Sequence, residues 1–350
     1  MGPSQGYLYT CDTRLGVILD ERGRILSPAN PCHGARKEES DSGMSDSADH
    51  LRPLAWKLRS IVGEDNVLEG EPMSGHTTFK IGGPADLYVI PEDPEEVRDV
   101  VAACGEAGEP YFVLGRGSDL LVSDDGYRGV IIAIADGLVN VSVDDEVMTC
   151  QAGVSLREAS EMACELGLTG LEFACGIPGS VGGACFMNAG AYDGCMADVL
   201  ASVRALMPDG SICDIDADDL QMGYRTSRVR TEGLVVLSAS FKLREGDPEA
   251  IREKMDDLTQ RRESKQPLEL PSAGSTFKRP EGHFAGKLIS DAGLQGYRVG
   301  GAEVSTKHAG FVVNVDNATA ADVHAVIEHV QDEVERQFGV RLEPEVRFLP

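Results

Sequence analysis

Positive charge, long apolar runs and paired cysteines are all scarce in this sequence, and each absence excludes a class of protein. Lys and Arg number 32 against 58 Asp and Glu, which leaves a formal net charge of −26 at pH 7. A nucleic-acid-binding surface needs a local excess of positive charge, so we expect no nucleic-acid partner. No apolar run approaches the roughly 18 residues that a membrane-spanning helix requires. The N-terminus also lacks the basic start and apolar segment of a signal peptide, so we expect no membrane association and a cytoplasmic location.

Cysteine is present, but without the spacing that gives it a structural role. The nine Cys residues are an odd number and include no C-x-x-C pair. A disulfide framework is unusual in a chain of 350 residues, and the spacing of zinc ligands is missing. We therefore expect buried free thiols in a reducing compartment and no metal site.

What the sequence does contain is enough apolar residues, 42% of the chain, for a sizeable core in more than one domain. Residues 1–50 are polar and lack periodicity, so we predict a disordered extension there. We place a first domain at residues 51–246, in two subdomains of about 51–137 and 138–246, and a second domain at 247–350.

Hydrophobic periodicity predicts an α+β fold. Strands at residues 85–91, 111–115 and 129–135 with a helix at 93–108 form a βαβ unit with a parallel pair. Further along the chain we predict two hairpins, two long helices and a short one. The hairpins lie at 141–153 and 202–215, the helices at 155–168, 247–267 and 319–340, and a terminal strand at 341–350. Ser155 with Glu158, and Thr319 with Asp322, have the spacing of helix caps.

Two glycine-rich loops stand out from this pattern. "LGRGSDLLVSDDG" (114–126) directly follows a strand, so its backbone N–H groups and Ser118 can converge on one anion. It is neither the dinucleotide fingerprint nor a Walker A loop, and taken alone it is more typical of an ordinary turn. "GIPGSVGGACFMNAGAY" (176–192) has so few side chains that its backbone can approach a ligand closely, although close packing of two elements also uses such a run. Together the loops indicate one extended ligand with a pyrophosphate.

These two loops, with "TTFKIGGPADLYVIP", "GYRTSRVR", "AGSTFKRPEGHFAGKLISDAGLQGYRVGGAEVSTKHAGFVVN" and "LEPEVRF", resemble the UDP-N-acetylenolpyruvoylglucosamine reductases of bacterial peptidoglycan synthesis. The resemblance runs in order over roughly residues 60–350. It implies a vanillyl-alcohol-oxidase-type FAD-binding domain of two α+β subdomains, followed by an α+β substrate domain. It also implies NADPH as hydride donor and a UDP-sugar as substrate. Arg225 and Ser275 lie close enough in sequence to indicate the shorter type, which lacks an inserted Tyr loop, and we expect a monomer or weak oligomer.

By this resemblance the bare backbone of both loops lies along FAD. FAD is expected to be held non-covalently, because the first loop contains no His or Cys. One residue departs from the family pattern, since Asp119 stands where Asn is usual, and an acidic group near a pyrophosphate would repel it unless it points away. The expected FAD contacts are Leu114, Gly115, Arg116, Gly117, Ser118, Asp119, Leu120, Gly176, Ile177, Pro178, Gly179, Ser180, Gly182, Gly183, Ala184, Asn188 and Ala189.

The resemblance implies three catalytic residues, Arg225, Ser275 and Glu345. Hydride addition to the enolpyruvyl group leaves negative charge that must be stabilised, and the adjacent carbon must then be protonated. The local sequence alone also allows non-catalytic roles. Arg225 could be a surface residue, Ser275 an ordinary loop residue, and Glu345 part of the solvated edge of a strand. Alternation along that strand puts Leu342, Val346 and Phe348 on one face, with Glu345 on the other beside Glu343 and Arg347.

Substrate contacts are expected from residues of the second domain, namely Lys265, Lys278, Arg279, Lys307 and His308. Two other functions stay open on the sequence. One is an FAD-dependent oxidase of the same fold, and the other is a non-catalytic nucleotide-binding module. Reaction of the reduced flavin with dioxygen would indicate the oxidase, and a colourless purified protein would indicate the nucleotide-binding module.

Overall fold

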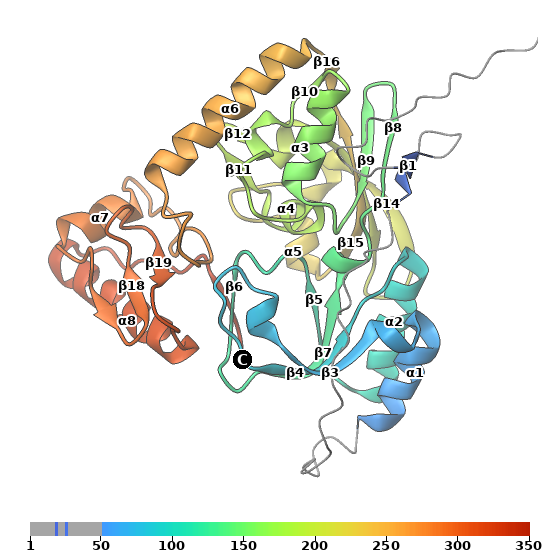
Figure 1. The fold of residues 1–350 in the computed structure, drawn as a ribbon, viewed down its shortest axis with the longest axis horizontal. Helices are drawn as coiled ribbons and strands as arrows, with labels where there is room; N and C mark the ends of the chain where they lie inside the picture. Colours follow the sequence, from blue (N-terminus) through green and yellow to red (C-terminus); the bar gives the residue numbers. More distant parts are fainter. Residues whose placement is uncertain (1–17, 20–24, 27–50) are drawn as a thin grey trace, which may run out of the picture.

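The computed structural model describes residues 18–19, 25–26 and 51–350. The predicted disorder of residues 1–50 therefore falls largely outside the described residues. Within that stretch, β1 (Ile18–Leu19) and β2 (Ile25–Leu26) pair antiparallel. Figure 1 shows the C-terminal helices and strands gathered on one side of a larger body, with a long helix running between the two parts. The boundaries at 51–246 and 247–350 remain a prediction.

The first unit of the body is a four-stranded sheet in the order β3-β4-β7-β5. β7 pairs in parallel with both β4 and β5, which confirms the predicted βαβ unit. The connecting helix α2 begins where the Asp93 side chain accepts a hydrogen bond from the Glu96 N–H, and Gly108 ends it in the left-handed conformation. The elements of this unit are α1 (Arg52–Val62), β3 (Val67–Pro72), β4 (Pro84–Val89), α2 (Pro94–Ala107), β5 (Tyr111–Leu114) and β7 (Tyr127–Ala133).

The second unit is a five-stranded antiparallel sheet in the order β14-β13-β15-β9-β8, which contains both predicted hairpins. Helix α3 begins with the predicted capping box of Ser155 and Glu158. Its strands and main helices are β8 (Val141–Asp144), β9 (Val147–Gln151), α3 (Leu156–Glu165), α4 (Val181–Met187), β13 (Leu200–Leu206), β14 (Ile212–Asp216) and β15 (Val235–Lys242).

The third unit follows the long helix α6 (Pro248–Lys265) and combines a three-stranded sheet with two helices. Thr319 and Asp322 form the predicted capping box of α8. The core of this unit also takes in Phe79, Ile81 and Leu121 from the first part of the chain. Its elements are α7 (Ala285–Asp291), β17 (Arg298–Val299), β18 (Ala302–Val304), β19 (Val312–Asn314) and α8 (Ala320–Phe338).

The end of the chain returns to the first unit, which the sequence pattern did not predict. The strand expected at 341–350 is shorter, and β20 (Arg347–Leu349) pairs in parallel with β6 (Leu120–Val122) beside the first loop. Just before it, Pro344 bridges to Phe277. Because the segment changes partners there, Leu349 is buried, whereas Phe348 is 41% exposed and packs on His324.

The remaining elements are short. They are the 3-10 turns η1 (Glu64–Asn66), η2 (Met73–Gly75), η3 (Ile134–Asp136), η4 (Glu172–Ala174), η5 (Met196–Asp198) and η6 (Ala217–Leu220), the helix α5 (Arg228–Glu232), and the strands β10 (Leu168–Thr169), β11 (Gly190–Ala191), β12 (Gly194–Cys195) and β16 (Arg244–Glu245). In the described part of the chain no helix is long and apolar enough to span a bilayer. The seven Cys residues of that part are free, and five of them are buried.

Candidate active site

The two glycine-rich loops meet at a cavity of about 640 Å³ between the first and second units. A Cβ on Gly115 would lie 2.6 Å from Ser180 Oγ, and one on Gly179 would lie 3.7 Å from Ser118 Oγ, so the loops are in contact. Residues 114–120 of the first loop and most of residues 177–184 of the second line the cavity. The two loops, which were expected to bind one ligand, therefore lie side by side at one cavity.

The backbone of the first loop has the geometry of an anion cradle. Gly117 has φ +58°, and a Cβ there would lie 2.1 Å from the His76 carbonyl oxygen, so only glycine fits. The N–H groups of Arg116, Gly117 and Ser118 donate to no described residue. Such N–H groups beside a cavity provide a site for phosphate oxygens.

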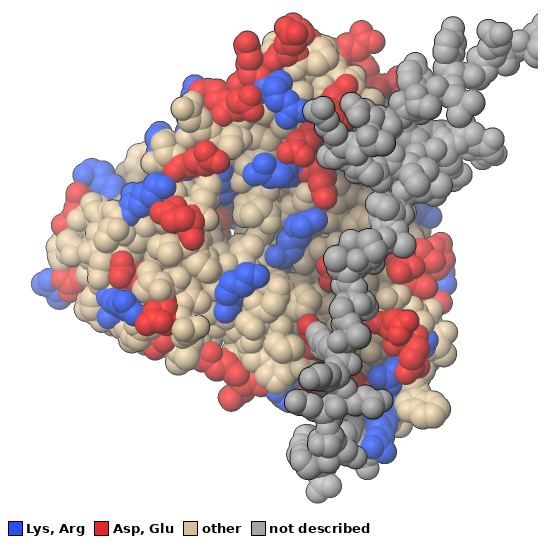
Figure 2. All heavy atoms as spheres, in the orientation of Figure 1, with Lys and Arg blue, Asp and Glu red and all other residues tan. Residues whose placement is uncertain are grey.

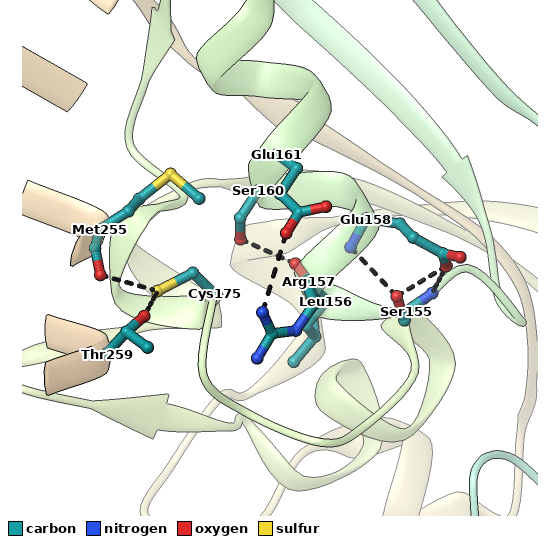
Figure 3. Close-up of polar contacts among 9 residues, drawn as sticks. All are labelled: Ser155, Leu156, Arg157, Glu158, Ser160, Glu161, Cys175, Met255 and Thr259. Carbon is teal, nitrogen blue, oxygen red and sulfur yellow. Dashed lines mark hydrogen bonds and ion pairs between the residues drawn. The ribbon is translucent and has the colours of Figure 1, made fainter. Parts of the chain in front are cut away.

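Helices α3 and α6 contact the second loop and hold it in position. The Leu156 N–H donates to the Gly179 carbonyl, and the Ser155 hydroxyl and Glu158 carboxylate complete the cap of α3 (Figure 3). At the start of the loop, Cys175 Sγ lies 3.7 Å from the Met255 carbonyl oxygen and 3.6 Å from Thr259 Oγ1 on α6 (Figure 3). These contacts hold the glycine-rich backbone in place although it has few side chains of its own.

Two of the expected FAD contacts do not line the cavity. Gly176 faces Arg262, since a Cβ there would lie 2.9 Å from the Arg262 side chain. Asn188 ends α4 in the left-handed conformation, where its amide donates to the Gly223 carbonyl and accepts from the Ala197 N–H. The other expected contacts, Ala189 included, line the cavity.

A second cavity of about 450 Å³ opens beside the first, against the third unit. Its lining includes Tyr224, Arg279, Phe284 and Lys307. Four residues line both cavities: Arg225, Ser275, His308 and Glu345. The three expected catalytic residues therefore lie at the junction of the two cavities, although they come from three separate parts of the chain.

Arg225 and Glu345 form an ion pair at this junction, with 2.7 Å between Arg225 Nε and Glu345 Oε1. The Nε–H does not point at a hydrogen-bond acceptor among the described residues. Arg225 has φ +55°, a strained value for a residue with a side chain. Its carbonyl accepts a hydrogen bond from Arg230 Nη1, and Gly223 bridges to Thr226 across the turn. Strain retained in this way is frequent at functional sites.

Ser275 is brought to Glu345 by the backbone of the next residue. The Glu345 N–H donates to the Thr276 carbonyl, and the Thr276 N–H donates to the Gly310 carbonyl. Burial raises the pKa of Glu345, and the nearby Arg225 opposes that effect. A carboxyl group of this kind can hold a proton at a pH where an exposed one cannot.

Asp119 and Arg347 also lie at the wall of the first cavity. The Arg347 N–H donates to the Asp119 carbonyl, and its guanidinium packs on Phe112 and Phe186, with 5.2 and 4.7 Å to the ring centroids. Burial next to Glu345 raises the pKa of Asp119 to about 7. Alternation along the terminal strand puts Arg347 on the same face as Glu345, but no role was predicted for Arg347.

The expected substrate contacts divide between the cavities. Arg279 and Lys307 line the second cavity, Lys265 the first, and His308 both. Lys278 lines neither, because its ammonium group is paired with Glu343. Burial lowers the pKa of His308. In Figure 2, several Lys and Arg side chains lie near the middle of the visible face, and others are mixed with Asp and Glu towards its edges.

The described residues contain no group of three or more His, Cys, Asp or Glu side chains arranged to hold a metal ion.

Comparisons with known proteins agree with this arrangement. Residues 85–216 match the family model "FAD binding domain", and residues 266–349 match "UDP-N-acetylenolpyruvoylglucosamine reductase, C-terminal domain". A UDP-N-acetylenolpyruvoylglucosamine reductase from Clostridium perfringens (strain SM101 / Type A) is 50% identical over 292 residues, 83% of this chain and 96% of the relative. One from Exiguobacterium sibiricum is 49% identical over 288 residues, 82% of this chain and 94% of the relative.

A solved structure shows the same likeness. The crystal structure of UDP-N-acetylenolpyruvylglucosamine reductase from Thermus caldophilus aligns with a TM-score of 0.69 at 34% identity, covering 81% of this chain and 98% of that one. The predicted fold class, an FAD-binding domain followed by a C-terminal α+β domain, is confirmed. The chain belongs to the UDP-N-acetylenolpyruvoylglucosamine reductase family.

Proposed function

We propose that this chain uses NADPH and FAD to reduce UDP-N-acetylglucosamine enolpyruvate to UDP-N-acetylmuramate, a step of peptidoglycan precursor synthesis. Membership of the reductase family supports the reaction. The structural observation that carries the proposal is the junction of the two cavities, where Arg225, Ser275 and Glu345 are exposed to both. A site that joins a cofactor to a separate substrate needs its reacting groups at such a junction.

The first cavity fits FAD. Its glycine-rich wall presents free backbone N–H groups from residues 116–118, and Gly117 and Gly182 leave no room for a side chain. Apolar residues such as Leu156, Ile177 and Val236 line other parts of the same cavity. We assign residues 114–120 and 177–184 to the cofactor, with the phosphates at the N–H groups. Bound FAD supplies the hydride transfer between the nicotinamide and the enolpyruvyl double bond.

The chain's own residues stabilise the negative charge on the substrate and supply the proton for C2. Addition of hydride to C3 of the enolpyruvyl group develops negative charge at C2, which spreads into the carboxylate. Arg225 and Glu345 face that carboxylate: the guanidinium offsets its charge, and Glu345 donates a hydrogen bond when it is protonated. Ser275 lines the same junction and gives its hydroxyl proton to C2.

The second cavity fits the sugar nucleotide. Arg279 and Lys307 are cations on its wall, and Tyr224 and Phe284 are largely exposed aromatic rings beside them. We assign Arg279 and Lys307 to the diphosphate, with Lys265 and His308 closer to the cofactor. We further propose that the protein acts in the cytoplasm, as a monomer or weak oligomer.

The direct test is turnover with defined substrates. Purified protein should be yellow, release its FAD on acid treatment, and oxidise NADPH only when UDP-N-acetylglucosamine enolpyruvate is added. Mass spectrometry of the product should show a gain of two hydrogens. NADPH oxidation that depends on dioxygen instead of the sugar nucleotide would favour an oxidase, and a colourless protein would favour a nucleotide-binding module.

A further inference from the structure

The carboxyl group of Asp119 lies at the site without a hydrogen-bond or ion-pair partner among the described residues, and its Oδ2 is fully buried. It nevertheless lies in the first loop, on the wall of the FAD cavity. An ionised carboxylate with a buried oxygen of this kind is expensive, because no described residue replaces the hydration that the oxygen has lost.

Every charged group that acts on Asp119 is already engaged elsewhere. From the C-terminal segment, Glu345 repels it, and Arg347 attracts it while packing on two aromatic rings. From the turn before α5, Arg225 pairs with Glu345. From α5 itself, Arg230 donates to the Arg225 carbonyl and packs over Phe186. The three guanidinium groups reduce the cost of ionising Asp119, but none of them forms an ion pair with it.

The ligand of this cavity makes ionisation still less favourable. FAD brings a negatively charged diphosphate, and the N–H groups placed to receive it belong to Arg116, Gly117 and Ser118, directly before Asp119 in the loop. A carboxylate there would repel the diphosphate, whereas a carboxylic acid would not. A neutral acid can also donate a hydrogen bond to an acceptor on the cofactor.

We propose that Asp119 contacts FAD as a neutral carboxylic acid, so that FAD binding takes up one proton from solvent. The reaction is free protein with ionised Asp119, plus a proton, plus FAD, giving the complex with protonated Asp119. The proposal rests on FAD being the ligand of the first cavity. The raised pKa of Asp119, about 7, agrees with it, since the proton is then available at moderate cost near neutral pH.

The proton uptake can be measured without any catalysis. Protein freed of FAD is titrated with FAD by calorimetry at about pH 8, in phosphate and in Tris, whose heats of ionisation differ. The difference in apparent binding enthalpy gives the number of protons taken up, which should be close to one at this pH and close to zero at about pH 5.5. By the same linkage, the FAD dissociation constant should rise roughly 30-fold between pH 6 and pH 8.5.

Three variants test whether Asp119 is the residue that takes up the proton. Asp119→Asn has the shape of the protonated acid and can donate a hydrogen bond, so it should bind FAD with no proton uptake and with a pH-independent dissociation constant. Asp125→Asn removes the same charge from an exposed position in the following turn and should behave as the wild type. Glu345→Gln should retain the uptake, because its proton is not the one taken up.

Several outcomes would overturn the proposal. They are FAD binding by the wild type without proton uptake at about pH 8, uptake that survives in Asp119→Asn, and uptake lost in Glu345→Gln instead. Failure of a folded Asp119→Asn variant to bind FAD would also overturn it. A wild-type protein that binds no FAD at all would contradict the proposed function itself, so the two failures can be told apart.

Discussion

Arg225 Nε lies 2.7 Å from Glu345 Oε1, and this contact joins a strained turn before α5 to the segment that leads into the last strand. The two side chains are 24% and 13% exposed, so the pair is shielded but still reaches both cavities. An ion pair in this position places the guanidinium of Arg225 and the carboxyl of Glu345 beside the same group of a bound substrate. It can therefore stabilise a carboxylate whose charge increases during the reaction.

Arg225→Ala should weaken substrate binding and slow the reaction with the sugar nucleotide. A hydrogen bond to a charged group contributes about 1.5–3 kcal/mol, so KM should rise roughly tenfold or more. Steady-state kinetics with varied sugar nucleotide measures this. Arg228→Ala is the matched control, because Arg228 pairs with Glu232 on α5 and lines neither cavity. Equal effects in the two variants would mean that Arg225 acts only through the fold.

Asp119→Asn should stabilise the protein without FAD, and only at higher pH. The pKa of Asp119 is raised to about 7 in the folded protein, from an ordinary value of 3.8. Because the pKa is higher in the folded protein, ionisation of Asp119 destabilises the fold. The free energy of unfolding is therefore highest below the pKa of the unfolded chain and decreases as the pH rises towards the pKa of the folded protein. The gain in the free energy of unfolding should thus be absent at about pH 4 and reach at most about 4 kcal/mol above pH 7. Urea unfolding at several pH values tests it; a gain of the same size at all pH values would exclude the ionisation of Asp119 as its cause.

Gly117→Ala should abolish FAD binding at micromolar cofactor. The added Cβ would lie 2.1 Å from the His76 carbonyl oxygen, so the loop must move away from its present position. Gly210→Ala is the control, because Gly210 also has positive φ, +84°, but no atom lies within 4 Å of its Cβ position. That variant should lose only the backbone preference of glycine, about 1 kcal/mol. The absorbance of bound flavin after gel filtration separates the two, and a yellow Gly117→Ala protein would contradict the cradle.

Local structure was predictable because it depends on near neighbours in the sequence. The capping boxes of α3 and α8 follow from residue types a few positions apart, and the strands and helix of the βαβ unit follow from local hydrophobic periodicity. The two glycine-rich loops were recognisable for the same reason, since their bare backbone has no ordinary role in a core. The family resemblance then supplied the roles of Arg225, Ser275 and Glu345, which the local sequence left open.

Long-range pairing was not predictable from the pattern. Alternation in the terminal segment ignores the change of partner at Pro344, so the pattern put Phe348 with the buried residues, although it is exposed. Asn188 was expected beside FAD, and the structure adds that it ends α4, with hydrogen bonds to Gly223 and Ala197 that depend on contacts distant in the sequence. The isolation of Asp119 likewise depends on groups distant in the sequence that are engaged with one another.

The most direct test of the central claim separates the two half-reactions in Ser275→Ala. Reduction of FAD by NADPH protonates no carbon of the sugar nucleotide, so its rate in stopped-flow should stay close to that of the wild type. Reoxidation by UDP-N-acetylglucosamine enolpyruvate needs a proton at C2 and should slow by about 10²–10⁴-fold, the usual contribution of general acid catalysis. Ser275→Cys should recover part of the rate, since a thiol can also donate a proton. Equal slowing of both half-reactions in Ser275→Ala would show that Ser275 supports the FAD site, and the proposed proton transfer would be wrong.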